Sequence, residues 1–114
     1  MSATYPDRRF QLWEYRVSHG ALLIRSPKGP DAETNIDFVF SGVEYVACPR
    51  MLRGLELVPT ATAEDVSRVA EGFGAVVAPD QVFVLLSAGQ RHLVVAASCH
   101  VSENMDDIFD IPLI

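Results

Sequence analysis

The sequence lacks the long apolar segments that would mark a membrane or secreted protein. No apolar run approaches the roughly 20 residues that a transmembrane helix requires. The first residues, MSATYPDRRF, have no apolar stretch behind their two arginines that could act as a secretory signal. We therefore expect a cytoplasmic protein that makes no membrane contact. With 114 residues, of which 49% are hydrophobic and 21% are charged, the chain has the size and composition of one folded domain.

Cysteine and histidine are scarce, and their spacing does not suit a metal site. Cys48 and Cys99 are far apart in the sequence, and His92 and His100 would be separated by roughly 26 Å on one extended strand. Only a site assembled from distant positions, such as the two cysteines, could bind a metal. We expect instead two reduced, buried thiols, because both lie in apolar segments and the cytosol keeps thiols reduced. Neither a metal nor an organic cofactor is expected.

Catalytic motifs are also absent. The chain contains no Gly-x-Ser-x-Gly nucleophile turn, no glycine-rich phosphate loop and no His-Glu-x-x-His motif. Gly72 and Gly74 flank a phenylalanine, but they follow a predicted helix, whereas a phosphate loop precedes one. Ser18 and His19 could be imagined as nucleophile and base, but a polar hairpin tip is the simpler interpretation of two neighbouring turn residues. The sequence therefore favours a protein that is not an enzyme.

Negative charge is concentrated in the second half of the chain. The formal net charge is -6. Through Leu57 seven basic residues balance seven acidic ones, whereas from Val58 onward two basic residues face eight acidic ones. Such a surface repels phosphate backbones, so we expect no nucleic acid among the partners.

The first half of the chain shows the alternation of apolar and polar residues that predicts β-strands. Residues 9–18 and 21–26 each place apolar side chains on one face, with a His-Gly turn between them. A two-residue loop at this turn would pair Glu14 with Arg25. The first hairpin is therefore predicted to have one apolar face and one charged face.

A second hairpin is predicted from residues 35–40 and 43–48, which flank a Ser-Gly turn. In this register Phe38 lies opposite Tyr45, and the pairs on that face are apolar. The stretch between the two hairpins contains two prolines and a glycine, so we expect a loop there. Residues 51–58 follow another proline and are expected to return as a short fifth strand.

One helix is predicted after the fifth strand. Thr62 and Asp65 have the spacing of a capping box, with Asp in place of the preferred Glu or Gln. Gly72 and Gly74 provide the stop, so the helix should cover about residues 63–71. The apolar stripe that would pack on the sheet consists of Val66, Val69, Ala70 and Phe73.

The last predicted hairpin joins residues 82–87 to residues 91–101. Both segments are apolar on both faces, which predicts central strands covered from both sides. Five strands, one helix and two strands would then form a single α+β domain over residues 1–104. We expect a mainly antiparallel sheet of about seven strands with the helix packed on one face.

Residues 105–114 form an acidic and apolar C-terminal tail, in which Pro112 prevents a regular helical ending. Leaving its large apolar side chains in water would be unfavourable, so we expect the tail to dock. Ile108, Phe109 and Ile111 are the predicted protein-contact residues. They are expected to add a strand to an exposed sheet edge, either of the same chain or of a neighbouring subunit.

Two arginines after the fourth predicted strand are candidates for an anion-binding site. Arg50 and Arg53 could hold a carboxylate or phosphate through paired hydrogen bonds from their guanidinium groups. The simpler interpretation is that they pair with surface acids such as Asp37 or Glu44.

These observations favour a small, non-enzymatic protein-interaction module that self-associates as a homodimer or binds another protein. A more specific hypothesis is an acidic inhibitor of the immunity type, which binds a basic partner. Electrostatic steering would then raise the association rate. The alternative is an enzyme or small-ligand binder that uses an arginine-lined site on the antiparallel sheet. Arg50, Arg53, His19 and Tyr45 would then contribute to that site.

Overall fold

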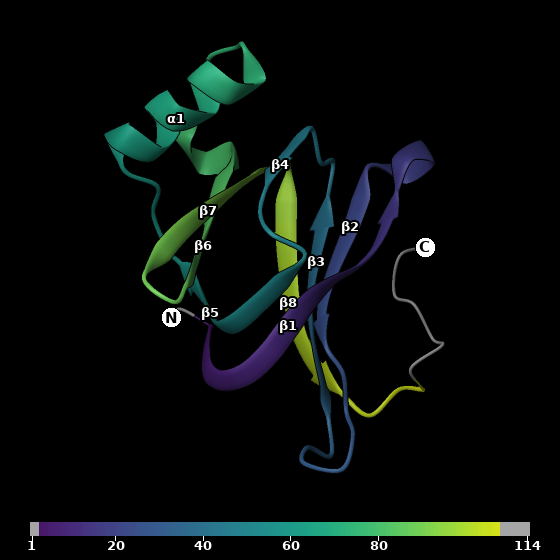
Figure 1. Ribbon diagram of the computed structural model, residues 1–114. Coiled ribbons are helices and arrows are strands. Elements are labelled where there is room, and N and C mark those ends of the chain that lie inside the picture. The colour runs from purple at the N-terminus through teal and green to yellow at the C-terminus, as the bar shows by residue number, and fades with distance from the viewer. Residues whose placement is uncertain (1–2, 108–114) are drawn as a thin grey trace.

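The computed structural model describes residues 3–107 and shows an α+β fold with one α-helix and an antiparallel sheet of eight strands. The strand order is β4-β7-β6-β5-β1-β2-β3-β8 (Figure 1). In chain order the elements are β1 (Thr4–Arg16), η1 (Val17–His19), β2 (Ala21–Ser26), β3 (Asn35–Ser41), β4 (Tyr45–Ala47), β5 (Met51–Val58), α1 (Ala63–Phe73), η2 (Pro79–Gln81), β6 (Val82–Ser87), β7 (Gln90–Val95) and β8 (Ser98–Asn104). The predicted fold class is confirmed, whereas the number and pairing of the strands differ from expectation. Within the described range no helix has the length and apolar character needed to span a bilayer.

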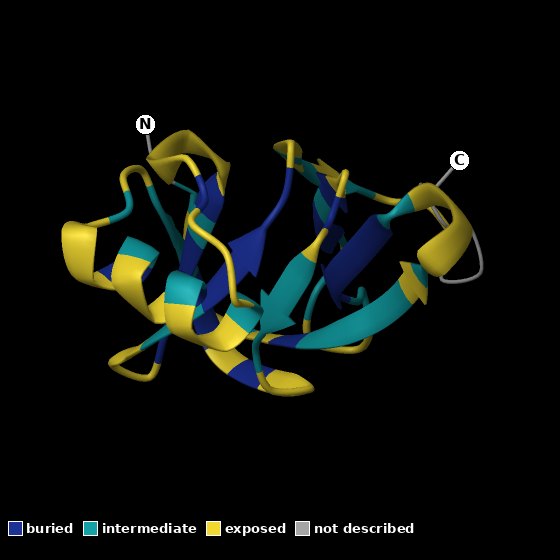
Figure 2. Ribbon diagram, turned by 90° about the horizontal axis from the view of Figure 1, so that it is seen from above, coloured by how far each residue is buried: buried dark blue, intermediate teal, exposed yellow. Residues whose placement is uncertain are grey.

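The sheet curls so that its two halves enclose the main core between them (Figure 1). Phe40 on β3 and Phe83 on β6 pack edge to face with ring centroids 5.7 Å apart, although three strands separate β3 from β6 in the sheet. Phe10 on β1 and Phe38 on β3 meet in the same way at 5.5 Å. Figure 2 shows buried strand segments in the middle of the molecule and exposed residues on the helix and loops.

A bulge where β1 crosses β5 bends the first strand. The register between these strands shifts by two residues, so that Pro6 to Arg8 on β1 face Gly54 on β5. Gly54 has a φ of +68°, and a Cβ atom at this position would lie 2.8 Å from the carbonyl oxygen of Pro6. A larger residue would strain both strands, so glycine is what permits the bulge and the bend that accompanies it.

The predicted capping box and helix are confirmed. The Thr62 hydroxyl accepts a hydrogen bond from the backbone N–H of Asp65 at 3.1 Å, and the Asp65 carboxylate accepts one from the N–H of Thr62 at 2.8 Å. The helix ends at Phe73 rather than near residue 71, because the left-handed conformation is taken by Gly74, with a φ of +82°.

The helix covers the outer face of β6 and β7. Val69 is fully buried in a second core cluster beside Val84 and Val95 of these strands. Leu85 and Val94, on the other face of the same strands, belong to the main core. The prediction of central strands covered from both sides is therefore confirmed for residues 82–87 and 91–95, but not for residues 98–101, which lie in the edge strand β8.

The first predicted hairpin forms, but its register was wrong. Residues 17–20 make a wider turn than the expected His-Gly loop, and β1 carries a further bulge at Trp13. Glu14 is therefore not opposite Arg25 and forms its salt bridge with Arg16 at 3.2 Å. The wider turn and the bulge are what shift the register, and Arg25 instead binds a carboxylate on its other neighbour, β3.

The second predicted hairpin was also wrong. Phe38 on β3 lies opposite Ile24 of β2 and Val101 of β8, whereas Tyr45 on β4 lies opposite Val95 of β7. After β3 the chain crosses to the other half of the sheet instead of turning back on itself. An apolar face fixes which side of a strand is buried, but it does not fix which strand pairs with it.

The last predicted strand is two strands, divided at Ala96 and Ala97. β7 pairs with β6 across a two-residue turn, while β8 crosses back and pairs with β3 over seven residues. The two crossing connections meet where the N–H of Ala97 donates to the carbonyl oxygen of Ser41 at 2.9 Å. This crossing makes β8 an edge strand and explains why the sheet has eight strands rather than about seven.

Candidate functional site

The two predicted anion-binding arginines are exposed, and the structure separates them. Arg50 lies in the bend before β5, whereas Arg53 lies within that strand. The expected pairing with Asp37 does not form, because Asp37 binds Arg25. Instead, the residue opposite Arg53 is Arg9 of β1, which is also exposed.

Arg9 and Arg53 project from the same outer face of the sheet. The adjacent cross-strand pair, Phe10 and Leu52, points into the main core, so alternation turns the arginine pair outward. Within residues 3–107 neither guanidinium group forms an ion pair or a hydrogen bond, although the backbone carbonyl of Arg53 accepts one from the Ser87 hydroxyl at 3.0 Å. Nothing in the sequence around Arg9 points to this arrangement, since only the register between β1 and β5 creates it.

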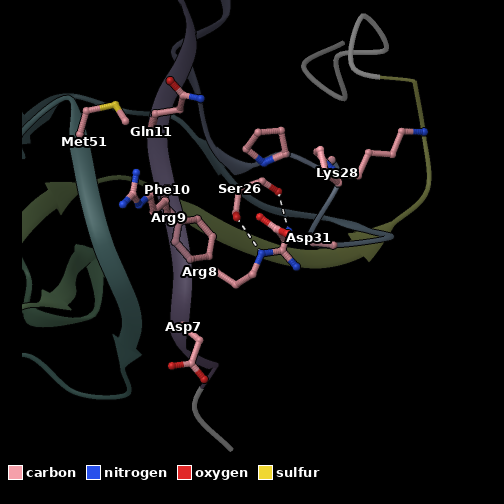
Figure 3. Close-up of a pocket in the computed structure, with 13 residues that line it drawn as sticks. Asp7, Arg8, Arg9, Phe10, Gln11, Ser26, Lys28, Asp31 and Met51 are labelled. Atoms are coloured by element: carbon pink, nitrogen blue, oxygen red, sulfur yellow. Dashed lines mark hydrogen bonds between the residues drawn. The ribbon is translucent and has the colours of Figure 1, made fainter.

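A cleft of about 680 Å³ lies beside this arginine pair, between β1 and the loop that joins β2 to β3 (Figure 3). Its charged lining consists of three basic residues, Arg8, Arg9 and Lys28, and two acidic residues, Asp7 and Asp31. Gln11 and the half-exposed Met51 lie at the end next to β5. The cleft therefore offers both charge and apolar surface to a ligand.

Arg8 forms one wall of the cleft and is held firmly in place. Its Nε donates to the hydroxyl of Ser26 at 2.9 Å, and its Nη2 donates to the carbonyl oxygens of Ser26 at 3.0 Å and Thr34 at 2.7 Å. All three acceptors are neutral, so these bonds leave the positive charge of Arg8 uncompensated. They also fix both ends of the loop between β2 and β3 to β1.

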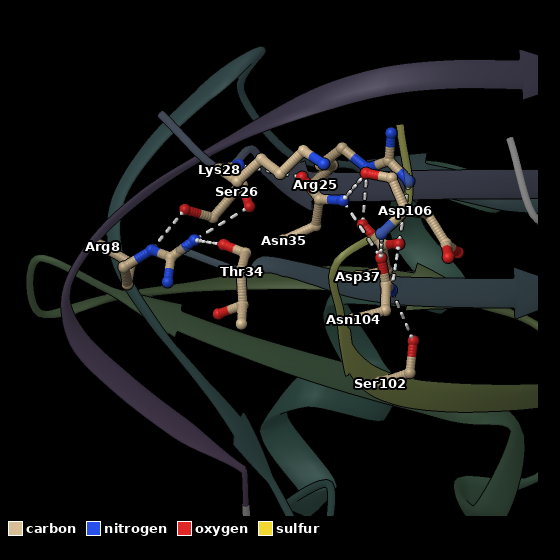
Figure 4. Close-up of polar contacts among 10 residues, drawn as sticks. All are labelled: Arg8, Arg25, Ser26, Lys28, Thr34, Asn35, Asp37, Ser102, Asn104 and Asp106. Carbon is tan, nitrogen blue, oxygen red and sulfur yellow. Dashed lines mark hydrogen bonds and ion pairs between the residues drawn. The ribbon is translucent and has the colours of Figure 1, made fainter. Parts of the chain in front are cut away.

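A buried ion pair lies on the outer face of β2 and β3 (Figure 4). Arg25 Nε donates to Asp37 Oδ1 at 2.7 Å and Arg25 Nη2 donates to Asp37 Oδ2 at 2.9 Å, and both side chains are fully buried. Trp13 packs on this pair, with its ring centroid 5.5 Å from Arg25 Cζ. The amide of Asn104 donates to Asp37 Oδ2 at 2.9 Å, which links the pair to β8.

The same network holds the residues that follow β8. Asn35 Nδ2 donates to Asn104 Oδ1 at 3.0 Å and to the carbonyl oxygen of Asp106 at 2.9 Å. Lys28 Nζ donates to the carbonyl oxygen of Met105 at 2.8 Å. The beginning of the C-terminal tail is thus fixed next to β3 (Figure 4). The predicted contact residues Ile108, Phe109 and Ile111 lie outside the described residues.

β8 has a long edge without a partner strand in the described structure. It pairs with β3 without a bulge from Ser98 to Asn104, and the sheet order places nothing on its other side. The opposite edge strand, β4, has only three residues. Sequence reasoning missed this edge because it assigned the residues of β8 to the last hairpin.

The remaining residues suspected of catalysis lie apart from the arginine surface. Ser18 Oγ and His19 Nδ1 are 3.0 Å apart, but both residues are exposed at the tip of the first hairpin. Tyr45 lies on β4, at the far edge of the sheet from β1, and its ring packs against Phe73 at 5.6 Å. These residues do not form a common site with Arg50 and Arg53.

The two cysteines are free thiols, half-buried beside the main core. Burial raises the pKa of Cys48 to about 11 and that of Cys99 to about 12, which disfavours the reactive thiolate. Within residues 3–107 no group of three or more His, Cys, Asp or Glu side chains is arranged to hold a metal ion.

The described residues thus offer two surfaces with unpaired polar groups, which are the arginine pair beside the cleft and the edge of β8. Comparison of the chain with protein-family models, curated proteins and solved structures gives no match.

Proposed function

We propose that the protein is a non-enzymatic interaction module that associates with a second copy of itself through the free edge of β8. The observation that carries this proposal is the length and regularity of that edge, which spans Ser98 to Asn104 without a bulge. Edge strands with unpaired backbone groups are templates for pairing, and proteins protect them with charged residues, proline or a bulge. β8 has no proline, lysine or bulge, and Glu103 is its one charged residue.

A two-fold axis beside the centre of β8 would relate the two copies. In an antiparallel arrangement centred on Val101, Glu103 would lie opposite Cys99 of the second copy rather than opposite its own counterpart. The two carboxylates are thus kept apart. Cys99 and Val101 face the main core and are only half-buried, so strand addition would cover them further. The three residues of β4 offer too short an edge for the same role.

Sedimentation and light scattering over a wide range of protein concentrations test this proposal. The chain should form dimers, and the double variant Ser98→Asp, His100→Asp should be monomeric, because both exposed side chains point away from the core and would bring four like charges together. The matched control, Ser67→Asp with Ala75→Asp, places the same charge on and after α1 and should dimerise like the unmodified protein. A monomer at all concentrations, or a dimer that survives the edge substitutions, would overturn the proposal.

A further inference from the structure

We infer that the outer face of β1 and β5, around Arg9 and Arg53, binds an extended segment of a partner protein in which a carboxylate is followed two residues later by an apolar side chain. This surface lies on strands in the middle of the sheet, whereas the proposed self-association uses the edge of β8. The two interactions can therefore be tested separately.

The first argument comes from the other cations of the chain. Most of these other Lys and Arg side chains form a hydrogen bond or an ion pair in the described structure. Arg9 and Arg53 therefore differ from most cations of the chain. The engaged cations are Arg8, Arg16, Arg25, Lys28, Arg68 and Arg91. Of the described arginines, only Arg50 and the pair formed by Arg9 and Arg53 make no such contact.

The second argument is energetic. Like charges directly opposite each other on adjacent strands are destabilising, and no described carboxylate forms an ion pair with Arg9 or Arg53. Guanidinium groups present planar forks of donors that match the two oxygens of a carboxylate. A carboxylate placed between the two arginines would remove the repulsion and gain charge-assisted hydrogen bonds.

The third argument is the spacing along the strands. Two residues after Arg9 comes Gln11, which is opposite Met51, so the arginine pair is followed on the same face by a partly apolar pair. Alternate residues of an extended peptide have the same spacing of roughly 7 Å. Consider a peptide that runs in the same direction as β1, with a carboxylate at Arg9. Its side chain two residues later would then lie over Met51, which is 49% exposed.

The acidic lining of the cleft limits the ligand to few charges. Asp7 and Asp31 also line the cleft and would repel a second carboxylate or a phosphate chain. The net charge of -6 adds to this repulsion at long range. A segment with one acidic position next to an apolar one fits these constraints better than a polyanion does.

Fluorescence anisotropy with a labelled peptide, acetyl-Thr-Thr-Glu-Thr-Leu-Thr-Thr, tests the proposal. The protein should bind it, and the double variant Arg9→Gln, Arg53→Gln should bind at least about tenfold more weakly, because both charge-assisted contacts are lost. The control Arg68→Gln removes one exposed charge on α1, where the guanidinium donates to the carbonyl oxygen of Arg91, and should bind normally. Replacing the peptide's Glu by Gln should weaken binding to a similar degree.

Further controls and the outcomes that would contradict the proposal are as follows. The β8 edge variant should bind the peptide like the unmodified protein, which separates this result from the outcome for self-association. Equal affinity of the peptide for the unmodified protein and for the arginine variant would overturn the proposal. Tighter binding of a single-stranded oligonucleotide, or full displacement of the peptide by inorganic phosphate at equal concentration, would also overturn it, because either would show a general anion site.

Discussion

Replacing Asp37 by Leu should destabilise the protein strongly. The substitution removes a carboxylate that accepts hydrogen bonds from Arg25 at 2.7 and 2.9 Å, in a place where neither side chain reaches solvent. Breaking a buried ion pair by removing one partner costs about 3–5 kcal/mol, because the remaining charge stays buried after losing its bidentate carboxylate. By comparison, Glu14→Gln breaks an ion pair that is about one-third exposed, and should cost at most about 1 kcal/mol.

The double variant Arg25→Met, Asp37→Leu separates the net contribution of the ion pair from the cost of removing only the carboxylate that binds the buried Arg25. Apolar residues of similar volume often replace a buried ion pair without loss of stability. We therefore expect the double variant to recover most of the free energy lost by Asp37→Leu. Asn104 would keep a partner, since its amide also donates to the hydroxyl of Ser102 at 3.2 Å.

Urea unfolding followed by tryptophan fluorescence measures these differences directly. The chain has one tryptophan, Trp13, and its ring packs against Arg25. The reasoning would be refuted if Asp37→Leu lost less than about 1 kcal/mol, which is the range of surface pairs. It would also be refuted if the double variant were less stable than the single one.

Four other perturbations have defined outcomes. Gly54→Ala should lower the free energy of unfolding by about 1–3 kcal/mol in urea titrations, because a side chain there meets the Pro6 carbonyl at a φ of +68°. The hydrogen bond from Arg91 lowers the pKa of Asp65 from 3.8 to about 2. Its stabilising effect is therefore complete above about pH 4 and is lost as the pH falls towards 2, where the unfolding free energies of the unmodified protein and Asp65→Asn should converge. Burial raises the pKa of Cys48 from 9.0 to about 11, so a thiol reagent at about pH 8 should find a thiolate population about 100-fold smaller than in the unfolded chain, and rapid native labelling would contradict this. Truncation after Asn104 removes the Met105 and Asp106 carbonyls that accept from Lys28 and Asn35 and should lower the melting temperature, whereas an unchanged value would show that these contacts contribute nothing.

The helix was predictable because the information that specifies it is local. Thr62 and Asp65 are three residues apart, and their reciprocal hydrogen bonds form within one turn. The apolar stripe that includes Val69 needs only some apolar surface to pack against, and β6 and β7 provide it. A helix with a clear cap and one apolar face can therefore be placed without knowledge of the sheet.

The strand pairing was not predictable in the same way. The residues of β3 and β4 alternate as a hairpin would, yet the short connection between them crosses to the other half of the curled sheet. The bulges at Trp13 and opposite Gly54 each shift a register, and no local rule locates them. The buried pair of Arg25 and Asp37 depends on the same long-range choice, because it requires β2 to lie beside β3 in the observed register.

The arginine surface shows which part of this information the sequence does carry. Once β1 and β5 are neighbours, Phe10 and Leu52 must both face the core, because a slip of one residue would turn one of them into solvent. That constraint places Arg9 and Arg53 on the same outer face, and the two-residue shift at the bulge sets them opposite each other. The apolar residues of the two strands thus determine the face on which the charged pair lies. The missing information is the identity of the neighbouring strand and the position of the bulge.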